Sequence, residues 1–231
     1  MGYAKKDEVI AEIKPANLVE VPIFIKGTAP LVINKFSNKA KEQMMATMAT
    51  PKNAKKAKSE RAPRDYEQDF QQAQHISVAG WHGIPCVAFR AAMIDACRTA
   101  GVVMTRAKMS IFVLADGFDK DEGTPLIKII SPNKSYPKRI ESLVRNDNGG
   151  ADIRIRPQWP EWSAVVRLQF DADMMTPESV FNLLDRAGRQ VGICEGRPFS
   201  KNSVGQGWGT FTVDIKETMK LSQNDKLKKA S

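Results

Sequence analysis

Two segments of the sequence combine basic side chains with glycines or tryptophans, a mixture that suits contact with phosphates and bases. The first is VGICEGRPFSKNSVGQGWGTFTV, residues 191–213, which we call the glycine loop. Its notable residues are Gly192, Gly196, Gly205, Gly207, Gly209, Arg197, Lys201 and Trp208. The glycines would allow positive φ and a close approach of another backbone. Arg197 and Lys201 could then contact phosphates, while Trp208 stacks on a base or supports the loop. The alternative is a structural surface loop with a core tryptophan.

The second segment is DIRIRPQWPEW, residues 152–162. Arg154 and Arg156 project from one face of a predicted strand, because side chains alternate along a strand. Trp159 and Trp162 follow, so the segment suits phosphate contact together with base stacking. The alternative interpretation is that the arginines are solvated and that the tryptophans cap the core.

A third basic segment, TPKNAKKAKSERAPR at residues 50–64, interrupts the helical pattern and is predicted to be a mobile loop that contacts phosphates. Its basic residues are Lys52, Lys55, Lys56, Lys58, Arg61 and Arg64. Arg90 and Arg98, in a predicted helix over 83–101, are two further candidates for phosphate contact. The whole chain has a net charge of +9 and a pI near 9.5, which favours a polyanionic partner.

The sequence gives weaker signals for catalysis. The glycine loop lacks the P-loop pattern and runs from a helix into a strand, which excludes both common nucleotide-binding loops. The two histidines, His75 and His82, have no cysteine partners at zinc-site spacing. The carboxylates of Asp116, Asp119, Asp121 and Glu122 do not fit the EF-hand pattern, so we interpret them as a solvated hairpin loop. We therefore expect no catalytic residue, no metal and no cofactor. The alternative is an endonuclease that uses either histidine, or these carboxylates with a metal.

Composition indicates the cellular compartment. The three cysteines are widely spaced and odd in number, which indicates reduced thiols in the cytoplasm. No apolar run approaches the ~18 residues of a membrane span, and the first residues have no apolar stretch typical of a secretion signal. We expect no membrane partner.

The elements that position these residues follow a recognisable order. Strands are predicted at 18–27, 110–116, 163–171 and 208–215, and helices at 83–101 and 177–190. This order predicts an α+β fold with a βαββαβ core and a largely antiparallel sheet. We predict a single domain over 1–231 with flexible ends at 1–16 and 221–231. A helical, basic insertion would occupy about 35–75, and β-hairpin insertions would occupy about 117–160.

Within the first insertion, a helix is expected after Ser37. Met44, Met45 and Met48 lie on it at helical spacing. We predict that they pack in the core. The alternative is an adaptable surface for a partner.

The glycine loop resembles the glycine-rich signature of the RAMP superfamily of CRISPR-associated RNA-binding proteins. The matching residues are Gly192, Gly196 and Arg197, then Gly205, Gly207, Gly209, Phe211 and Val213. GIPCVAFRAAMIDACR, from residue 83, is similar to a segment of the backbone subunits of CRISPR effector complexes. Ile84 and Pro85 match, Arg90 replaces the basic residue, and Cys86 stands where the family has glycine. LVINKFSNKAK and GICEGRP also resemble segments of small bacteriophage proteins.

The resemblance covers mainly 83–101 and 163–215. It implies a ferredoxin-like (RRM-like) core, subunits that stack along single-stranded nucleic acid as a homo-oligomer or helical filament, and a protruding insertion that touches the strand. Together with the basic charge, it leads us to expect a non-catalytic protein that binds single-stranded DNA or RNA with little sequence preference. A further alternative is a phage protein that binds an acidic protein partner.

Overall fold

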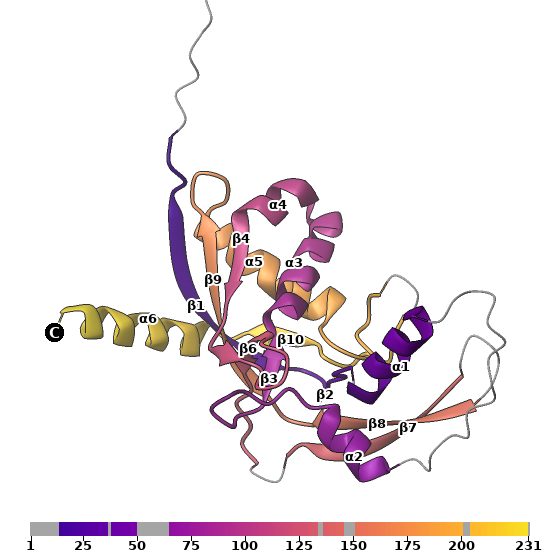
Figure 1. Cartoon of the computed structure of the whole chain (residues 1–231). Coiled ribbons are helices and arrows are strands. Elements are labelled where there is room, and N and C mark those ends of the chain that lie inside the picture. Colours follow the sequence, from indigo (N-terminus) through magenta and orange to yellow (C-terminus); the bar gives the residue numbers. More distant parts are fainter. Residues whose placement is uncertain are drawn as a thin grey trace, which may run out of the picture.

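A computed structural model describes residues 14–36, 38–49, 65–133, 136–145, 151–200 and 204–230. Its centre is a four-stranded sheet with the order β10-β1-β9-β4, in which all neighbours are antiparallel (Figure 1). The strands are β1 (Leu18–Gly27), β4 (Ile111–Leu114), β9 (Ser163–Asp171) and β10 (Phe211–Val213). Helix α3 (Cys86–Ala100) lies between β1 and β4 in the chain, and α5 (Pro177–Arg186) lies between β9 and β10. This is the ferredoxin-like α+β core that the sequence predicts.

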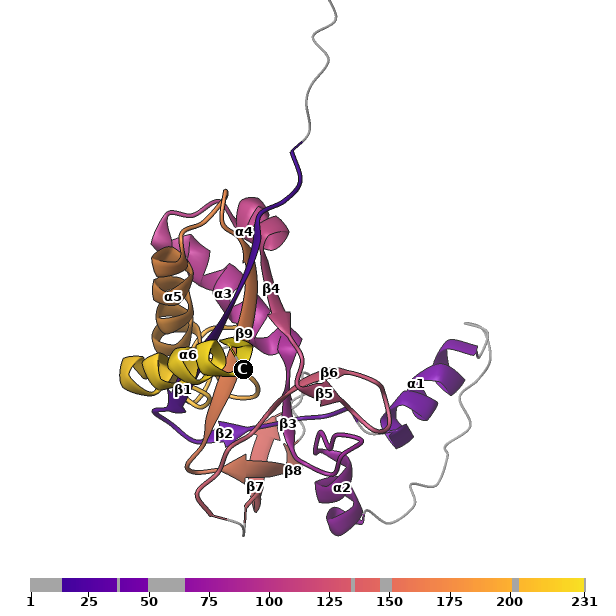
Figure 2. The same ribbon diagram turned by 90° about the vertical axis from the view of Figure 1, so that its left-hand side faces the viewer.

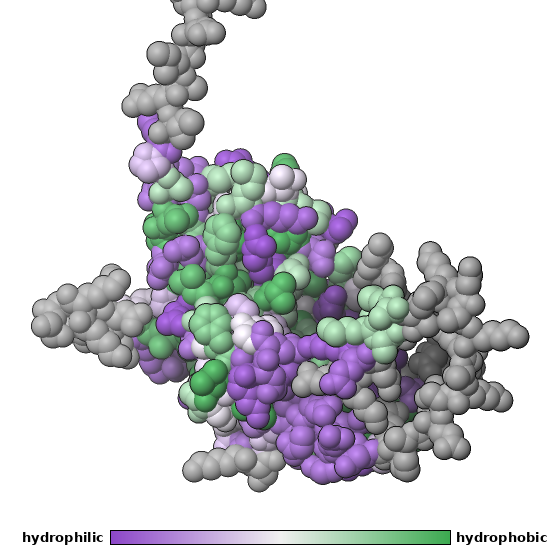
Figure 3. Space-filling model, viewed as in Figure 1, coloured by the Kyte–Doolittle hydropathy of each residue, from purple (hydrophilic) through white to green (hydrophobic). Residues whose placement is uncertain are grey.

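Alternation along the strands gives the sheet one buried face. Ala164, Val166, Leu168 and Phe170 of β9 are each fully buried, whereas the residues between them are partly or largely exposed. Phe89 of α3 is fully buried in the same core. Figure 2 shows α3 and α5 on the same side of the sheet. The opposite face carries both apolar and hydrophilic side chains (Figure 3).

Local signals fix the helix ends. Thr176 caps α5, because its side chain accepts a hydrogen bond from the Ser179 N–H at 3.2 Å. Gly101 ends α3 with a φ of 70°. After α5 the chain makes one π-helical turn, η1 (Ala187–Val191), and enters the glycine loop. The predicted cap at Thr176 and the predicted stop at Gly101 are both confirmed.

Small elements extend the core on one side. Within 35–75 lie α1 (Asn38–Ala49) and α2 (Tyr66–Gln72). The β7–β8 hairpin (Lys138–Arg145 and Ala151–Trp159) pairs with β2 (Leu31–Val32) in a three-stranded sheet. A second small sheet has the order β3-β6-β5, from Gly83–Pro85, Pro125–Lys128 and Gly117–Phe118. The sequence did not predict α4 (Met104–Ser110), and it assigned 83–85 to the helix rather than to β3.

Two helices bear on the expectations from the sequence. Helix α6 (Ile215–Ala230) covers most of 221–231, the end that is predicted to be flexible, and its lysines and leucines favour a helix. The prediction that the α1 methionines pack in the core is wrong. Met44, Met45 and Met48 are 48%, 68% and 79% exposed, because α1 projects from the body (Figure 1). Within the described ranges, no helix combines the length and apolar character that crossing a membrane requires.

Candidate functional site

The glycine loop folds back on itself. The Ile193 N–H donates to the Gly209 carbonyl at 3.0 Å. The N–H groups of Gln206 and Trp208 donate to the Gly196 carbonyl at 2.8 and 3.1 Å. The two arms of the loop therefore lie against each other and are joined by backbone hydrogen bonds.

The loop is also tied to the segment around β2. The Glu195 N–H donates to the Val32 carbonyl at 3.0 Å, and the Gly209 N–H donates to the Pro30 carbonyl at 2.8 Å. These bonds hold the loop beside the β2–β8–β7 sheet, although 163 and 179 residues separate the partners along the chain.

Close backbone contact explains two of the glycines. Gly205 has a φ of 64°, and a Cβ there would lie 1.9 Å from the Arg197 carbonyl oxygen. Gly209 has a φ of 67°, and its Cβ would lie 2.0 Å from the Ile193 carbonyl oxygen. Neither position can accept a side chain without moving the opposite arm, which is the use of glycine that the sequence indicates.

A groove runs between this loop and the β7–β8 hairpin. It consists of two adjoining cavities of about 460 and 470 Å³ that share Arg154, Cys194, Glu195 and Arg197. The first cavity extends to Ser142, Gly196, Ser200, Gly205, Gln206 and Trp208. The second extends past Ile33, Asn34 and His75 to Pro85, Val87 and Ala88 at the start of α3. We refer to these two cavities together as the groove.

Two arginines give the groove its available positive charge. Among the described residues, the Arg154 side chain has no hydrogen-bond or ion-pair partner, whereas its backbone is paired opposite Ser142 in the β7–β8 ladder. Arg197 donates one hydrogen bond, from Nη1 to the Cys194 carbonyl at 3.2 Å. Arg156 differs, because its Nε lies 2.5 Å from Glu195 Oε2 and its side chain is only 13% exposed. Glu195, which lines both cavities, is therefore already paired with Arg156, which lies outside the lining, while Arg154 and Arg197 can meet an anion.

The tryptophans divide between core and groove. Trp159 and Trp162 are 2% and 3% exposed, and Trp162 Nε1 donates to the Ala29 carbonyl at 2.9 Å. They belong to the core, which decides between the two interpretations of residues 152–162 for these side chains. Trp208 is half-buried and lines the first cavity. A Cβ at Gly196 would lie 2.5 Å from its ring, so the tryptophan supports the loop directly.

Two predicted arginines lie away from the groove lining. Arg90 donates from Nε to the Ile111 carbonyl at 2.9 Å and also to the Lys108 carbonyl, so it joins α3 to the end of α4. Arg98 is 59% exposed and lies 3.7 Å from Asp95. Because an α-helix rises ~1.5 Å per residue, Arg98 lies roughly 18 Å along α3 from the end that borders the groove.

Seven predicted basic residues lie outside the described residues. They are Lys52, Lys55, Lys56, Lys58, Arg61, Arg64 and Lys201.

The sequence did not connect Ser142, Asn34 and His75 with the groove. They come from β7, from the segment after β2 and from the segment after α2, which are far apart along the chain. No local pattern of residue types marks such a meeting point, and only the folded chain brings the three side chains to one cavity.

A buried polar cluster lies beneath the second cavity. Lys35 Nζ lies 2.8 Å from Asp119 Oδ1 and 2.7 Å from Asp121 Oδ2. His75 Nδ1 lies 2.9 Å from Asp119 Oδ2. The Asp119 side chain is fully buried and the Lys35 side chain is 5% exposed, so this cluster joins three distant segments of the chain.

Burial and hydrogen bonding set the charges in this cluster. Burial lowers the pKa of His75, and the Asp119 carboxylate only partly offsets this effect. Burial opposes ionisation of Asp119, but hydrogen bonds from Lys35, the Asp121 N–H and His75 outweigh it and lower the pKa of Asp119. The pKa of Lys35 is raised, because its bonds to Asp119 and Asp121 exceed the cost of burial. At neutral pH the cluster thus contains a charged Lys35, a charged Asp119 and a neutral His75.

The neighbouring carboxylates are already paired with cations. Arg167 Nη2 lies 2.8 Å from Asp116 Oδ1, and Lys41 pairs with Glu122. Among the described residues, no three histidine, cysteine or carboxylate side chains come together as a metal site would require. The prediction of a solvated hairpin loop is wrong for Asp119, because its side chain is fully buried against Lys35 and His75.

Comparisons with known proteins identify no family. No family model and no curated protein matches the chain. Among solved structures, the crystal structure of Cmr6 from Pyrococcus furiosus is similar over 86% of this chain and 99% of that one. The TM-score is 0.37 and the sequence identity is 12%.

Proposed function

We propose that this protein binds single-stranded nucleic acid along the groove, with little sequence preference, without cleaving it, and that it oligomerises along the strand. The observation that carries the proposal is the pair of arginines, Arg154 and Arg197, in a groove between the hairpin and the glycine loop. Neither guanidinium is neutralised by a carboxylate in the described residues, so both can bind phosphate. The two cavities, at about 460 and 470 Å³, fall in the size range of small-ligand sites, roughly 300–1,000 Å³, and suit a single strand better than a duplex.

The net charge of +9 supports the same proposal. The basic segment 50–64 and Lys201 would add further phosphate contacts. We also propose that the chain is a relative of the RAMP superfamily, encoded by a phage and acting in the bacterial cytoplasm. The RAMP relationship rests on the glycine pattern and on the ferredoxin-like core. The phage origin rests on the resemblance of LVINKFSNKAK and GICEGRP, and the cytoplasmic location on the three widely spaced cysteines.

The test is a salt titration of binding. A labelled single strand of about 10 nucleotides, within the range covered by one binding domain, is titrated with wild-type protein, Arg154→Ala and Arg197→Ala. Each variant should bind more weakly, and the slope of log affinity against log salt should fall by about 1 for each lost phosphate contact. Arg98→Ala is the matched control, because it removes an exposed arginine outside the groove. Equal losses in all three variants, or an unchanged salt slope, would contradict the assignment of the groove.

Cleavage of RNA is a second candidate function, and the His75–Asp119 pair favours it. Asp119 accepts the Nδ1 proton of a neutral His75, which leaves Nε2 without a partner among the described residues. His75 lines the second cavity together with Arg154 and Arg197. Nε2 could remove the proton of a ribose 2′-hydroxyl as its oxygen attacks the adjacent phosphate. The P–O5′ bond would then break and O5′ would take a proton from water, leaving a 2′,3′-cyclic phosphate.

One assay distinguishes the two candidate functions, binding alone and RNA cleavage. Single-stranded RNA and DNA of the same sequence are incubated with the protein in EDTA, and the products are resolved by gel. RNA cleavage that is lost in His75→Gln and retained in His82→Gln supports the second candidate. Intact RNA under conditions of saturated binding contradicts it and leaves binding alone.

A further inference from the structure

The first feature that bears on assembly is an apolar stripe on α1. Met44, Met45 and Met48 are exposed, and Phe36 just before the helix is 53% exposed. The ion pair between Lys41 and Glu122 joins the first turn of α1 to the body. Figure 3 shows apolar side chains gathered over α1. Methionine side chains are flexible and polarisable, which suits them to adaptable protein contacts.

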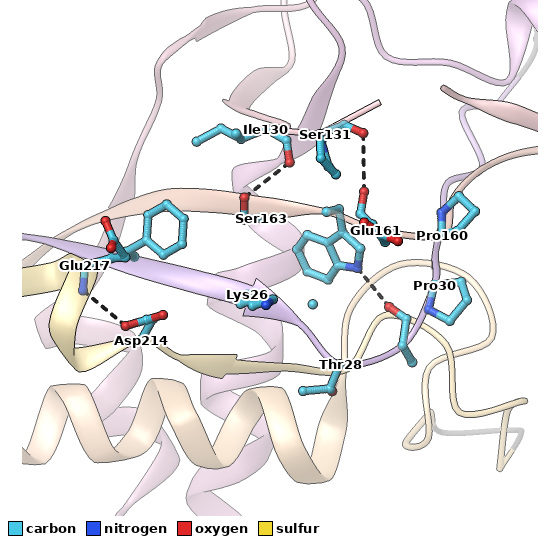
Figure 4. A pocket seen from close by; sticks show the side chains of 15 residues that line it. Lys26, Thr28, Pro30, Ile130, Ser131, Pro160, Glu161, Ser163, Asp214 and Glu217 are labelled. Atoms are coloured by element: carbon cyan, nitrogen blue, oxygen red, sulfur yellow. Dashed lines mark hydrogen bonds between the residues drawn. The ribbon is translucent and has the colours of Figure 1, made fainter. Parts of the chain in front are cut away.

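The second feature is an apolar pocket where β1, the β8–β9 turn and the first turn of α6 meet (Figure 4). Its volume is about 780 Å³, which is ample for several side chains. The apolar lining residues are Phe24, Ala29, Pro30, Ile130, Pro132, Pro160 and Trp162. This pocket is separate from the groove, because the two share no lining residue.

The pocket carries negative charge. Glu161, Asp214 and Glu217 lie at its lining, against one basic residue, Lys26. Lys220 pairs with Glu217 at 2.6 Å and offsets part of this charge. In a chain with a net charge of +9, two copies repel each other over most of their surfaces. A basic surface of a second copy that approaches the rim of this pocket is attracted instead.

We propose that the α1 methionine stripe of one copy docks in this pocket of the next copy. The inference rests on the proposed function for its biological purpose, since it names the surfaces through which copies assemble along a strand. In Figure 1, α1 and α6 lie on opposite sides of the central sheet, and Asp214 and Glu217 lie at the start of α6. The stripe therefore cannot reach the pocket of its own chain. Two unlike surfaces on opposite sides give a head-to-tail contact that propagates into an open array unless the rotation closes a ring.

A mixing experiment tests this contact directly. The stripe variant is Met45→Glu with Met48→Glu, and the pocket variant is Pro132→Arg with Glu161→Arg, both at exposed positions or at the rim. Particle mass is measured by sedimentation over a range of concentrations for the full chain. Wild type should grow with concentration, each variant alone should stay a single copy, and an equal mixture should form pairs and nothing larger. The pair forms because each variant retains the surface that the other lacks.

Several results would overturn the inference. These are a wild type that stays single at high concentration and on long strands, variants that assemble like wild type, or a mixture without pairs. Met109→Glu is the matched control, because it changes another exposed methionine, 67% exposed, on α4, and it should assemble like wild type.

A binding measurement keeps this inference distinct from the proposed function. On a strand of about 10 nucleotides, the stripe and pocket variants should bind as tightly as wild type. On a long strand they should lose the growth into large particles. If wild type fails to bind the short strand, the proposed function is wrong, whereas the mixing experiment still decides the contact between copies.

Discussion

At the scale of single residues, the lining of the groove includes a residue with an uncommon backbone conformation. Cys194 lies where both cavities meet and has a φ of 63°, although it is not a glycine. Such a conformation costs of order 1 kcal/mol and persists only when the surrounding structure enforces it. Here the hydrogen bonds of Ile193 and Glu195 hold the chain on both sides. Burial raises the pKa of Cys194 to about 12, so its thiol stays protonated and adds no negative charge between the arginines.

The glycine loop gives a matched pair of residue predictions. Gly209→Ala should lower the free energy of unfolding by more than about 2 kcal/mol, because a Cβ there would lie 2.0 Å from the Ile193 carbonyl oxygen. Gly207→Ala should cost only about 1 kcal/mol, since its φ is 78° but no atom lies within 4 Å of the added Cβ. Urea unfolding of both variants checks the difference. Equal losses would mean that backbone strain, and not the close approach of the two arms, explains these glycines.

At the scale of elements, the Arg156–Glu195 ion pair joins β8 to the glycine loop. Its side chains are 13% and 24% exposed, so water screens it less than a surface pair. The pair is therefore one of the links that hold the loop beside the hairpin, together with the backbone bonds of Glu195 and Gly209.

A double-mutant cycle measures this link. Arg156→Met and Glu195→Gln should each lower the free energy of unfolding by about 1–3 kcal/mol, because each leaves a partly buried charge without its partner. The double variant should lose less than the sum, with a coupling energy of about 0.5–3 kcal/mol. Additive losses would show that the two side chains act independently. Arg139 and Glu141, an exposed pair on β7, form the control cycle, with a coupling below about 1 kcal/mol.

The elements also show what sequence patterns can predict. The alternation in residues 163–171 correctly predicted a strand, and Thr176 was correctly predicted to cap a helix. Both predictions succeeded because burial on one face and capping are local properties. Helix α4 was not predicted, because its seven residues MTRAKMS have no side-chain cap and make too short a periodic pattern. The spacing of Met44, Met45 and Met48 predicted a helix face correctly but not whether another element covers it. The groove was predicted only in part, since Asn34, His75 and Ser142 meet through tertiary structure.

At the scale of the whole molecule, the buried cluster of Lys35, His75 and Asp119 makes stability depend on pH. Burial lowers the pKa values of both His75 and His82 below the ordinary 6.5. A lowered histidine pKa means that the unfolded chain binds protons more readily than the folded one. The resulting stability is fully present above pH 6.5 and declines as the pH falls below it.

Unfolding in urea between pH 8 and pH 5 should therefore give a free energy of unfolding that decreases below pH 6.5. Each histidine contributes a slope of at most about 1.4 kcal/mol per pH unit. His75→Gln should remove one of the two contributions and His82→Gln the other. A further decrease is expected below about pH 3.8 because the pKa of Asp119 is lowered, and stability should also fall above about pH 10.5 because the pKa of Lys35 is raised. A flat profile between pH 8 and pH 5 would contradict the burial of the histidines.

The two ends of the groove are chemically different. One end has Ser142, Gln206 and Trp208, and the other has Asn34, His75 and Ala88. A nucleic-acid strand also has a direction, from its 5′ end to its 3′ end. A strand in this groove would therefore have a preferred polarity, and every protein copy on it would face the same way. The two ends of such an assembly would therefore always differ. New protein copies could then add at one end only, so the first copy bound would fix where the assembly begins on the strand.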